Sequence, residues 1–241
     1  MHRYLSIEYL KLRHSHISWV VVATNIIATS FTSIWLLPTS LPNNIRLATF
    51  QNNFTTIWLY IGLTVLAFEK ARQGQAAGNF FNVRQSVIDM PTYYRDLVLN
   101  LYWLFFKGLV LYEVLSLTFI AFTSGISNLN LYQGIVLPML FIALFASWLL
   151  PVIYLLIINL PNFITVLVVL SLLISGVGTL PTTWSVATYN IAHLAGVNPN
   201  GLAIDHYSNS LIGPAIITTF VMVALLEGIL YLHTRSQNHA K

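Results

Sequence analysis

Residues 133–157 read QGIVLPMLFIALFASWLLPVIYLLI, and this stretch decides the fold class. It contains no charged side chain and is longer than the roughly 20 residues that an α-helix needs to cross a bilayer. Lipid offers no hydrogen-bond partners to the backbone, so an apolar segment of this length satisfies its own peptide groups as a helix. The stretch therefore predicts a transmembrane helix.

Five further stretches are long and apolar in the same way. They are residues 17–37, 48–68, 105–123, 163–180 and 211–232. A membrane β-barrel would need alternating apolar and polar residues, whereas these runs are apolar on every side. We therefore expect an all-α membrane protein with six transmembrane helices, forming one domain over residues 1–241.

The composition excludes two other classes of protein. Only 7% of the 241 residues are charged and 56% are hydrophobic, whereas a soluble domain carries roughly a quarter charged residues. So few charges cannot cover a surface that faces water, which rules out a soluble globular enzyme. A disulfide scaffold is excluded because the chain has no cysteine.

The basic residues predict the orientation of the chain. With both termini in the cytoplasm, one basic residue, Arg46, lies outside, and Lys107 stands at a span boundary, where it can reach the inner headgroups. The basic residues that then lie inside are Arg3, Lys11, Arg13, Lys70, Arg72, Arg84, Arg95, Arg235 and Lys241. The positive-inside rule favours this orientation. The net charge of +4 thus reflects membrane topology, and we expect no nucleic-acid partner.

The N-terminal arm, residues 1–16, mixes apolar and charged side chains. Glu8, Lys11 and Arg13 are set among leucines and tyrosines, a mixture that suits a short helix in the headgroup zone. Glu8 and Lys11 are three residues apart and can pair on a helix surface. A simple flanking anchor for the first span explains the same pattern, and both interpretations stay open.

The largest predicted cytoplasmic segment is residues 69–104. Helix-forming residues after Glu69 predict that the second span continues into the cytoplasm, with a break at Gly78-Asn79. Pro91 opens an aromatic stretch, 92–106, which we expect along the inner interface before the third span begins near residue 105. A connection of this length is usually functional.

The predicted extracellular segment is residues 181–210. Its first half is too apolar for a solvated loop, so residues 182–194 predict a short interfacial or re-entrant helix. Asn198-Pro199 and Asn200-Gly201 then predict turns.

Two carboxylates stand inside the predicted spans: Glu113 in the third and Glu227 in the sixth. A charge near the bilayer centre costs roughly 2.5–3.5 kcal/mol on insertion scales. The apolar residues of a span outweigh that cost, so insertion tolerates both. They either line a substrate path or a contact between subunits, or they pair with a neighbouring helix near an interface.

Common catalytic and cofactor motifs are missing from the sequence. It contains no His-Glu-x-x-His, no Gly-x-Ser-x-Gly and no Gly-x-x-x-x-Gly-Lys-[Ser/Thr]. We therefore expect no catalytic residue, metal or cofactor site in this chain. If the protein uses ATP, a partner chain must bind the nucleotide.

Three stretches carry a family resemblance. They are residues 8–13 (EYLKLR) before the first span, the pair Glu69-Lys70 with residues 76–80 (AAGNF) after the second, and residues 196–201 (GVNPNG) before the last. Their order and their placement against six spans resemble the permease subunits of bacterial lantibiotic (bacteriocin) immunity ABC transporters, which are exporter-type six-helix permeases.

The resemblance implies a function and a set of partners. Such a permease sits in the bacterial cell membrane with a second, homologous permease subunit and two ATP-binding subunits, which bind ATP and Mg²⁺. The complex exports a lantibiotic peptide from the membrane to the outside and so protects the producer cell. The resemblance places the coupling helix at about residues 69–83 and makes the N-terminal arm the interfacial helix beside it. The residues it implies for ATPase coupling are Glu69, Lys70, Arg72, Gly78, Asn79 and Phe80.

Three other readings of the sequence remain. An ATP-independent secondary transporter or channel would require the intramembrane carboxylates and an ion gradient. An intramembrane enzyme is disfavoured by the missing motifs. A passive membrane anchor or assembly factor is also compatible with the sequence. An ATPase partner that copurifies with the chain would separate the permease from the others.

Overall fold

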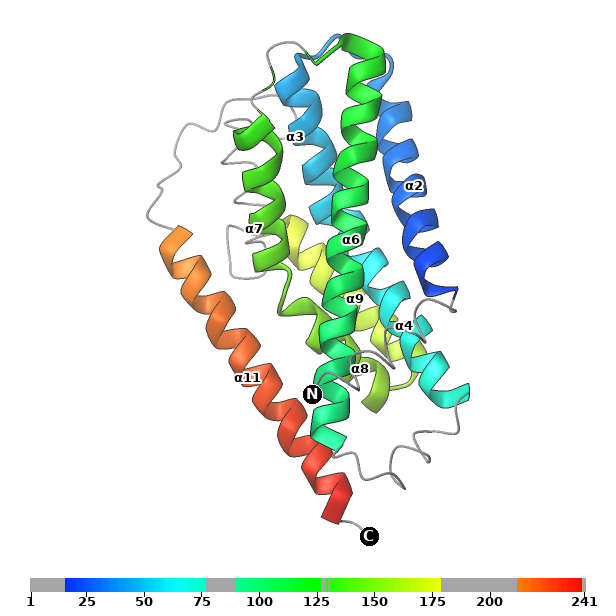
Figure 1. Ribbon diagram of the computed structural model, residues 1–241, viewed down its shortest axis with the longest axis vertical. Helices are drawn as coiled ribbons and strands as arrows, with labels where there is room; N and C mark the ends of the chain where they lie inside the picture. The colour runs from blue at the N-terminus through cyan, green and yellow to red at the C-terminus, as the bar shows by residue number, and fades with distance from the viewer. Residues whose placement is uncertain (1–15, 77–89, 127–128, 130, 179–211, 240–241) are drawn as a thin grey trace.

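The computed structural model is a bundle of helices (Figure 1). It describes residues 16–76, 90–126, 129, 131–178 and 212–239. Within those residues every regular element is helical, which confirms the expected all-α class. The predicted N-terminal arm, including Glu8, Lys11 and Arg13, and the predicted segment 181–210 lie outside the described residues, as do Gly78, Asn79 and Phe80.

The described helices run back and forth along the bundle. In chain order they are α2 (Ile17–Leu36), α3 (Asn43–Asn53), the π-helical segment η1 (Phe54–Trp58), α4 (Leu59–Ala76), α6 (Met90–Ser124), the π-helical segment η2 (Tyr132–Val136), α7 (Leu137–Phe145), α8 (Leu149–Asn159), α9 (Asn162–Gly178) and α11 (Ile212–His239). α3, η1 and α4 follow one another without a break, as do η2 and α7. In Figure 1, the chain runs upward through α2 and downward through α11, which reaches the bottom of the bundle.

Four described stretches are long and apolar enough to cross a membrane. They are Ile17–Leu36, Asn43–Gln73, Tyr93–Ser124 and Gly134–Asn159. Two shorter apolar stretches, Asn162–Ile174 and Thr219–Leu232, correspond to the fifth and sixth predicted spans. The structure thus bears out four of the six expected membrane helices by length and composition.

The third predicted span begins earlier than the sequence indicated. Residues 92–106 do not form a separate interfacial stretch, because α6 is one continuous helix from Met90. Pro91 stands in its first turn, where the missing N–H is not needed, so the proline starts the helix instead of interrupting it. Tyr94, Leu97 and Leu101 of this stretch are buried in the core.

The fourth predicted span is not a single regular helix. α7 ends at Phe145, and α8 begins at Leu149 after a turn at residues 146–148. Ser147 Oγ donates to the carbonyl of Leu144, and Tyr102 Oη of α6 donates to the carbonyl of Ser147 at 2.5 Å. These bonds satisfy polar groups that the break in the helix would otherwise leave without partners.

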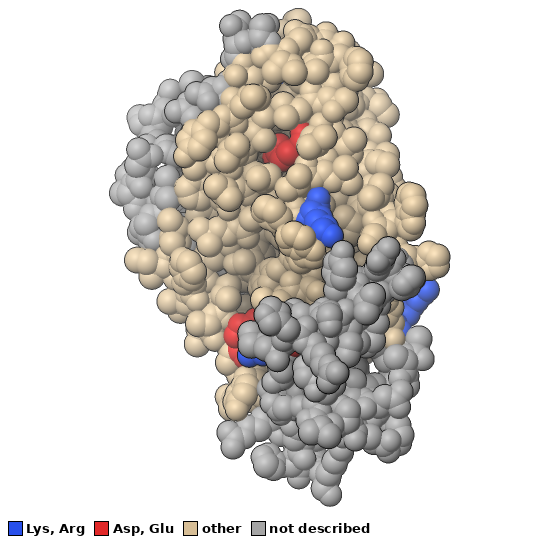
Figure 2. All heavy atoms as spheres, viewed as in Figure 1, with Lys and Arg blue, Asp and Glu red and all other residues tan. Residues whose placement is uncertain are grey.

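The outer surface of the bundle is strongly apolar. Large side chains point away from the core on α2, α9 and α11, including Trp19 (72% exposed), Phe163 (74%) and Ile217 (65%). Figure 2 shows that charged atoms are sparse over the upper part of the visible face. Such a surface needs lipid or another subunit against it, which agrees with a membrane protein.

Candidate functional site

The most polar part of the candidate membrane helices, α3, lies in the interior of the bundle. α3 packs against α2, α6 and η2 (Figure 1), and each residue from Arg46 to Asn53 is buried. Its polar members are Arg46, Thr49, Gln51, Asn52 and Asn53, and Thr55 follows in η1. A buried polar group costs free energy unless it is hydrogen-bonded. The bundle therefore surrounds a polar interior, which is our candidate site.

Gln51 connects three elements at the centre of this interior. Its Nε2 donates to the carbonyl of Gly134 in η2 at 2.7 Å and to Oε1 of Glu113 in α6 at 3.4 Å. Glu113 is 2% exposed, and no hydrogen-bond partner for its second oxygen, Oε2, is found in the described part of the chain. The neutral side-chain amide of Gln51 thus links α3 both to the backbone of η2 and to the buried carboxyl group on α6.

Both π-helical segments lie beside this contact. η1 follows directly after α3, and η2 contains Gly134. Thr55 Oγ1 donates to the carbonyl of Gln51 at 2.9 Å, and Thr56 Oγ1 donates to that of Asn52 at 2.7 Å. Such hydroxyl-to-carbonyl bonds compete with regular helix geometry, and π-turns occur frequently at functional sites. The two π-helical segments and the buried carboxyl group of Glu113 therefore lie in the same part of the bundle.

Aromatic side chains close one side of the polar interior. Tyr112, next to Glu113 on α6, donates from Oη to the carbonyl of Phe50 at 2.9 Å. Its ring packs against Phe54 with centroids 4.5 Å apart, and Phe50 contacts Phe119 edge-on at 5.5 Å. These contacts hold α6 against α3 and keep Tyr112 itself fully buried.

Arg46 links the upper ends of α3 and α6 through hydrogen bonds. Its Nε and Nη2 donate to the carbonyls of Leu41 and Thr39, and its Nη1 donates to Thr123 Oγ1 at 3.1 Å. Close by, Asn43 Nδ2 donates to the carbonyl of Gly125 at 2.8 Å. The basic residue predicted to lie outside is thus a buried structural link between the start of α3 and the end of α6.

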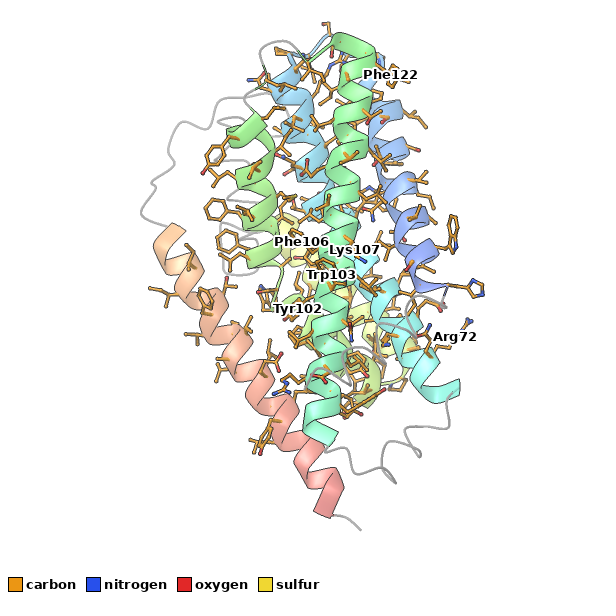
Figure 3. The ribbon with its side chains drawn as sticks, in the orientation of Figure 1. Arg72, Tyr102, Trp103, Phe106, Lys107 and Phe122 are labelled. Carbon is orange, nitrogen blue, oxygen red and sulfur yellow. The ribbon has the colours of Figure 1, made fainter. Side chains whose placement is uncertain are left out.

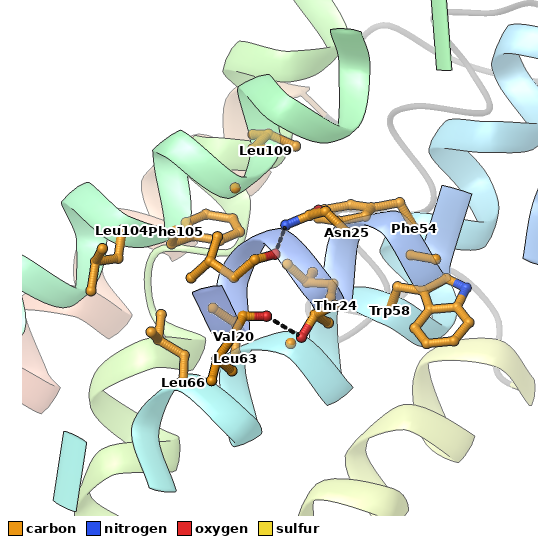
Figure 4. Close-up of a pocket in the computed structure, with 15 residues that line it drawn as sticks. Val20, Thr24, Asn25, Phe54, Trp58, Leu63, Leu66, Leu104, Phe105 and Leu109 are labelled. Carbon is orange, nitrogen blue, oxygen red and sulfur yellow. Dashed lines mark hydrogen bonds between the residues drawn. The ribbon is translucent and has the colours of Figure 1, made fainter. Parts of the chain in front are cut away.

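A small cavity of about 40 Å³ lies below the polar interior, between α2, α4 and α6 (Figure 4). Its lining is mostly apolar, with Leu63, Leu66 and Phe105 among its walls. The polar side chains of Thr24 and Asn25 are turned to their own helix, where they donate to the carbonyls of Val20 and Val21. This cavity has the character of a packing gap and carries no functional assignment.

The two carboxylates that were predicted to lie within membrane spans, Glu113 and Glu227, do not form one site. Arg95 and Tyr102 of α6 lie within electrostatic range of Glu227 on α11. Arg95 is 18 residues from Glu113 on the same helix, a rise of about 27 Å. Glu113 belongs to the polar interior, whereas Glu227 is half-buried between α11 and the lower part of α6.

The residues implied for ATPase coupling differ in exposure where they are described. Arg72 is exposed and lies near the lower end of α4 (Figure 3), 3.7 Å from the carboxylate of Glu69. Lys70 is only 4% exposed. A partner protein can therefore contact the guanidinium group of Arg72 but not the ammonium group of Lys70 in this arrangement.

Lys107 occupies the middle of α6 and not the start of a helix. Its side chain is exposed, and Nζ lies 4.9 Å from the centroid of the Trp103 ring (Figure 3). A long lysine stem can carry its ammonium group along an apolar helix toward water. The expectation that Lys107 reaches the inner headgroups therefore stays a prediction, although the helix itself begins 17 residues earlier.

Sequence reasoning missed Gln51, Arg46 and Gly134 as members of the polar interior. A signal was present, because residues 43–56 are far more polar than the rest of the second apolar segment. Taking residue 48 as the start of that span divided the polar stretch and concealed it. Within the described residues, no group of three His, Asp or Glu side chains suitable for a metal ion comes together.

Comparisons of the chain with models of known protein families, with curated proteins and with solved structures gave no match.

Proposed function

We propose that the chain is the membrane-spanning permease subunit of an ATP-driven exporter in the bacterial cell membrane, with both termini in the cytoplasm. Its substrate is a lantibiotic-type peptide, which it moves from the membrane to the outside and so protects the producer cell. The observation that carries the proposal is the length by which α4 and α6 extend beyond the lower end of α2.

The extension follows from the packing of α6 on α2. A side chain added at Gly108 would meet Val21 and Asn25, so these residues lie at one level. From there α6 continues 18 residues to Met90, about 27 Å, whereas α2 continues only four residues from Val21 to Ile17, about 6 Å. The lower half of α6 therefore extends well past the described start of α2 (Figure 1).

The lower end of α4 carries charges suited to a soluble partner. Arg72 and Glu69 have side chains that are 78% and 30% exposed, and the chain between α4 and α6 leaves from this end. In this proposal, two ATP-binding subunits dock against residues 69–83 and supply ATP and Mg²⁺. Their approach and separation shift α4 and α6 relative to the other helices.

The apolar flanks of the bundle supply a surface for a second permease subunit. α9 exposes Phe163, Leu167 and Ile174, and α11 exposes Ile217 and Leu225. Helices that expose such side chains are stable only against lipid or another apolar surface. A homologous partner on one flank would leave the other flank facing lipid and the peptide.

Copurification from the native host tests the proposal. We expect a P-loop ATPase to elute with the chain in stoichiometric amounts and to be lost when residues 77–83 are replaced by glycine and serine. Replacing residues 127–130 in the same way perturbs the opposite end of the bundle and should retain the ATPase. Elution of an intact chain alone, under conditions that preserve other membrane complexes, would refute ATP coupling.

An ion-driven secondary transporter is the second candidate, and the burial of Glu113 beside Gln51 is the observation that favours it. Export into inside-out vesicles separates the two. If the uptake of peptide needs ATP and survives a protonophore, it supports the exporter. If it is abolished by the protonophore while ATP is present, it supports ion coupling.

A further inference from the structure

We propose that Glu113 is a proton-binding site inside the membrane bundle and that it carries its proton at neutral pH. The inference concerns the chemistry of this side chain and goes beyond the proposed function, because it does not depend on whether ATP drives transport. Its ligand is the proton itself, held on a carboxyl group among α3, α6 and η2.

The first argument is the shortage of hydrogen-bond donors. An ionised carboxylate has about four acceptor positions and is stabilised by several donors. Glu113 accepts one long bond of 3.4 Å from Gln51, and the shorter bond of that amide, 2.7 Å, goes to the carbonyl of Gly134. Oε2 has no donor in the described structure. This environment suits a neutral acid better than an anion.

The second argument is the absence of a neighbouring cation among the described residues. On α3 the basic residue is Arg46, whose guanidinium bonds to Thr123, ten residues from Glu113 along α6 and about 15 Å away in rise. On α6 the basic residue is Lys107, six residues before Glu113, with its ammonium group over Trp103.

The other elements around the site contribute no charge. No charged residue is found in α2, η2, α7 or α8. The turn at residues 146–148, which joins α7 to α8, has none either. Tyr112 is the nearest titratable neighbour in sequence, and its hydroxyl is already bonded to the carbonyl of Phe50. No described cation is therefore available to compensate a negative charge on Glu113.

Solvation decides between the two forms of the group. An unpaired ionised carboxylate in a medium of low dielectric constant is so unfavourable that such a group normally takes up a proton instead. Glu113 is 2% exposed in the interior of an apolar bundle. Binding a proton removes the charge, and with it the cost of keeping an unpaired ion in the apolar interior.

Infrared spectroscopy of the full chain in lipid vesicles tests the proposal. The chain has only four glutamates, Glu8, Glu69, Glu113 and Glu227, so cell-free synthesis with ¹³C-labelled glutamate isolates their carbonyl bands. At about pH 7 we expect a labelled band of a protonated carboxylic acid. That band should disappear in Glu113→Gln and remain in Glu227→Gln, the matched control.

A conservative variant keeps the test decisive if Glu113→Gln does not fold. In Glu113→Asp the carboxyl group stays, but it no longer carries the glutamate label, so the labelled acid band should again be lost. The proposal is overturned if the wild-type chain shows no labelled acid band at about pH 7. It is equally overturned if that band persists unchanged in the folded Glu113→Asp protein.

Discussion

Gly108 of α6 lies directly against Val21 of α2, because a Cβ atom built on the glycine would come within 3.0 Å of Val21 Cγ1. The same atom would lie 3.1 Å from Asn25 Nδ2. The close approach of two membrane helices at a small residue is a common packing device in bilayers. It fixes the level at which α6 passes α2, and with it the length of α6 left to extend below.

Gly108→Leu should therefore destabilise the bundle by about 1–3 kcal/mol, since the larger side chain forces α2 and α6 apart. Thermal unfolding of the purified chain in detergent measures the effect. Gly228→Leu is the matched control, because a Cβ at Gly228 meets nothing within 4 Å. On helix propensity alone, that control should be neutral or stabilising by up to about 1 kcal/mol. Equal unfolding temperatures for the two variants would contradict the packing.

Arg46→Ala should lower stability by about 1–3 kcal/mol, because it leaves the partly buried carbonyls of Leu41 and Thr39 without their donor. Arg46→Lys should recover only part of the loss, since an ammonium group cannot reproduce the guanidinium fork. Arg72→Ala removes an exposed charge at the opposite end and should change stability by no more than about 0.5 kcal/mol. Unfolding midpoints of the three variants check the order, and a cost for Arg72→Ala equal to that for Arg46→Ala would refute it.

Gln51→Leu and Glu113→Leu should not act independently. The first variant removes the donor from both Glu113 and the carbonyl of Gly134, and the second removes one acceptor from Gln51. Because the two side chains contact each other, the double variant should cost less than the sum of the single ones, with a coupling energy of about 0.5–3 kcal/mol. A double-mutant cycle on unfolding free energies measures it. Strict additivity would show that the long contact contributes nothing.

The two ends of the bundle should lie on opposite sides of the membrane. The chain has no native cysteine, so single cysteines report without background. Ile126→Cys, just beyond the upper end of α6, should react with a membrane-impermeant maleimide in intact cells. Arg72→Cys, at the lower end of α4, should react only in inside-out vesicles. Labelling of both from the same side would contradict the arrangement of α4 and α6.

The contrast between α2 and α3 explains how far the sequence could predict the site. The first predicted span, 17–37, agrees with the observed helix, Ile17–Leu36, to within one residue. The agreement is close because a long, uniformly apolar segment can cross a bilayer only as a helix. α3 has a low hydropathy and was partly excluded from the second predicted span. Its polar side chains are stable only because α2, α6 and η2 enclose them, and no local pattern reports that enclosure.

Glu113 illustrates the same limit at the level of one side chain. Its position in an apolar run made it a candidate from the sequence alone, because carboxylates are rare and costly there. Its partner could not be identified in that way, since Gln51 is 62 residues away along the chain and lies on another helix. The sequence contains many polar side chains that could have filled this role, and helix packing selected one.

By itself, the sequence determined that the chain is helical and has segments long and apolar enough to cross a membrane, because apolar composition, segment length and backbone hydrogen bonding in lipid are properties that each segment carries alone. The tertiary structure decided what the helices enclose: the polar α3 in the interior, Arg46 as a buried link, and Glu113 with Gln51 as its one described donor. The physical reason is that the environment of a buried polar group depends on which distant helices meet around it. That is a property of packing and not of any one segment.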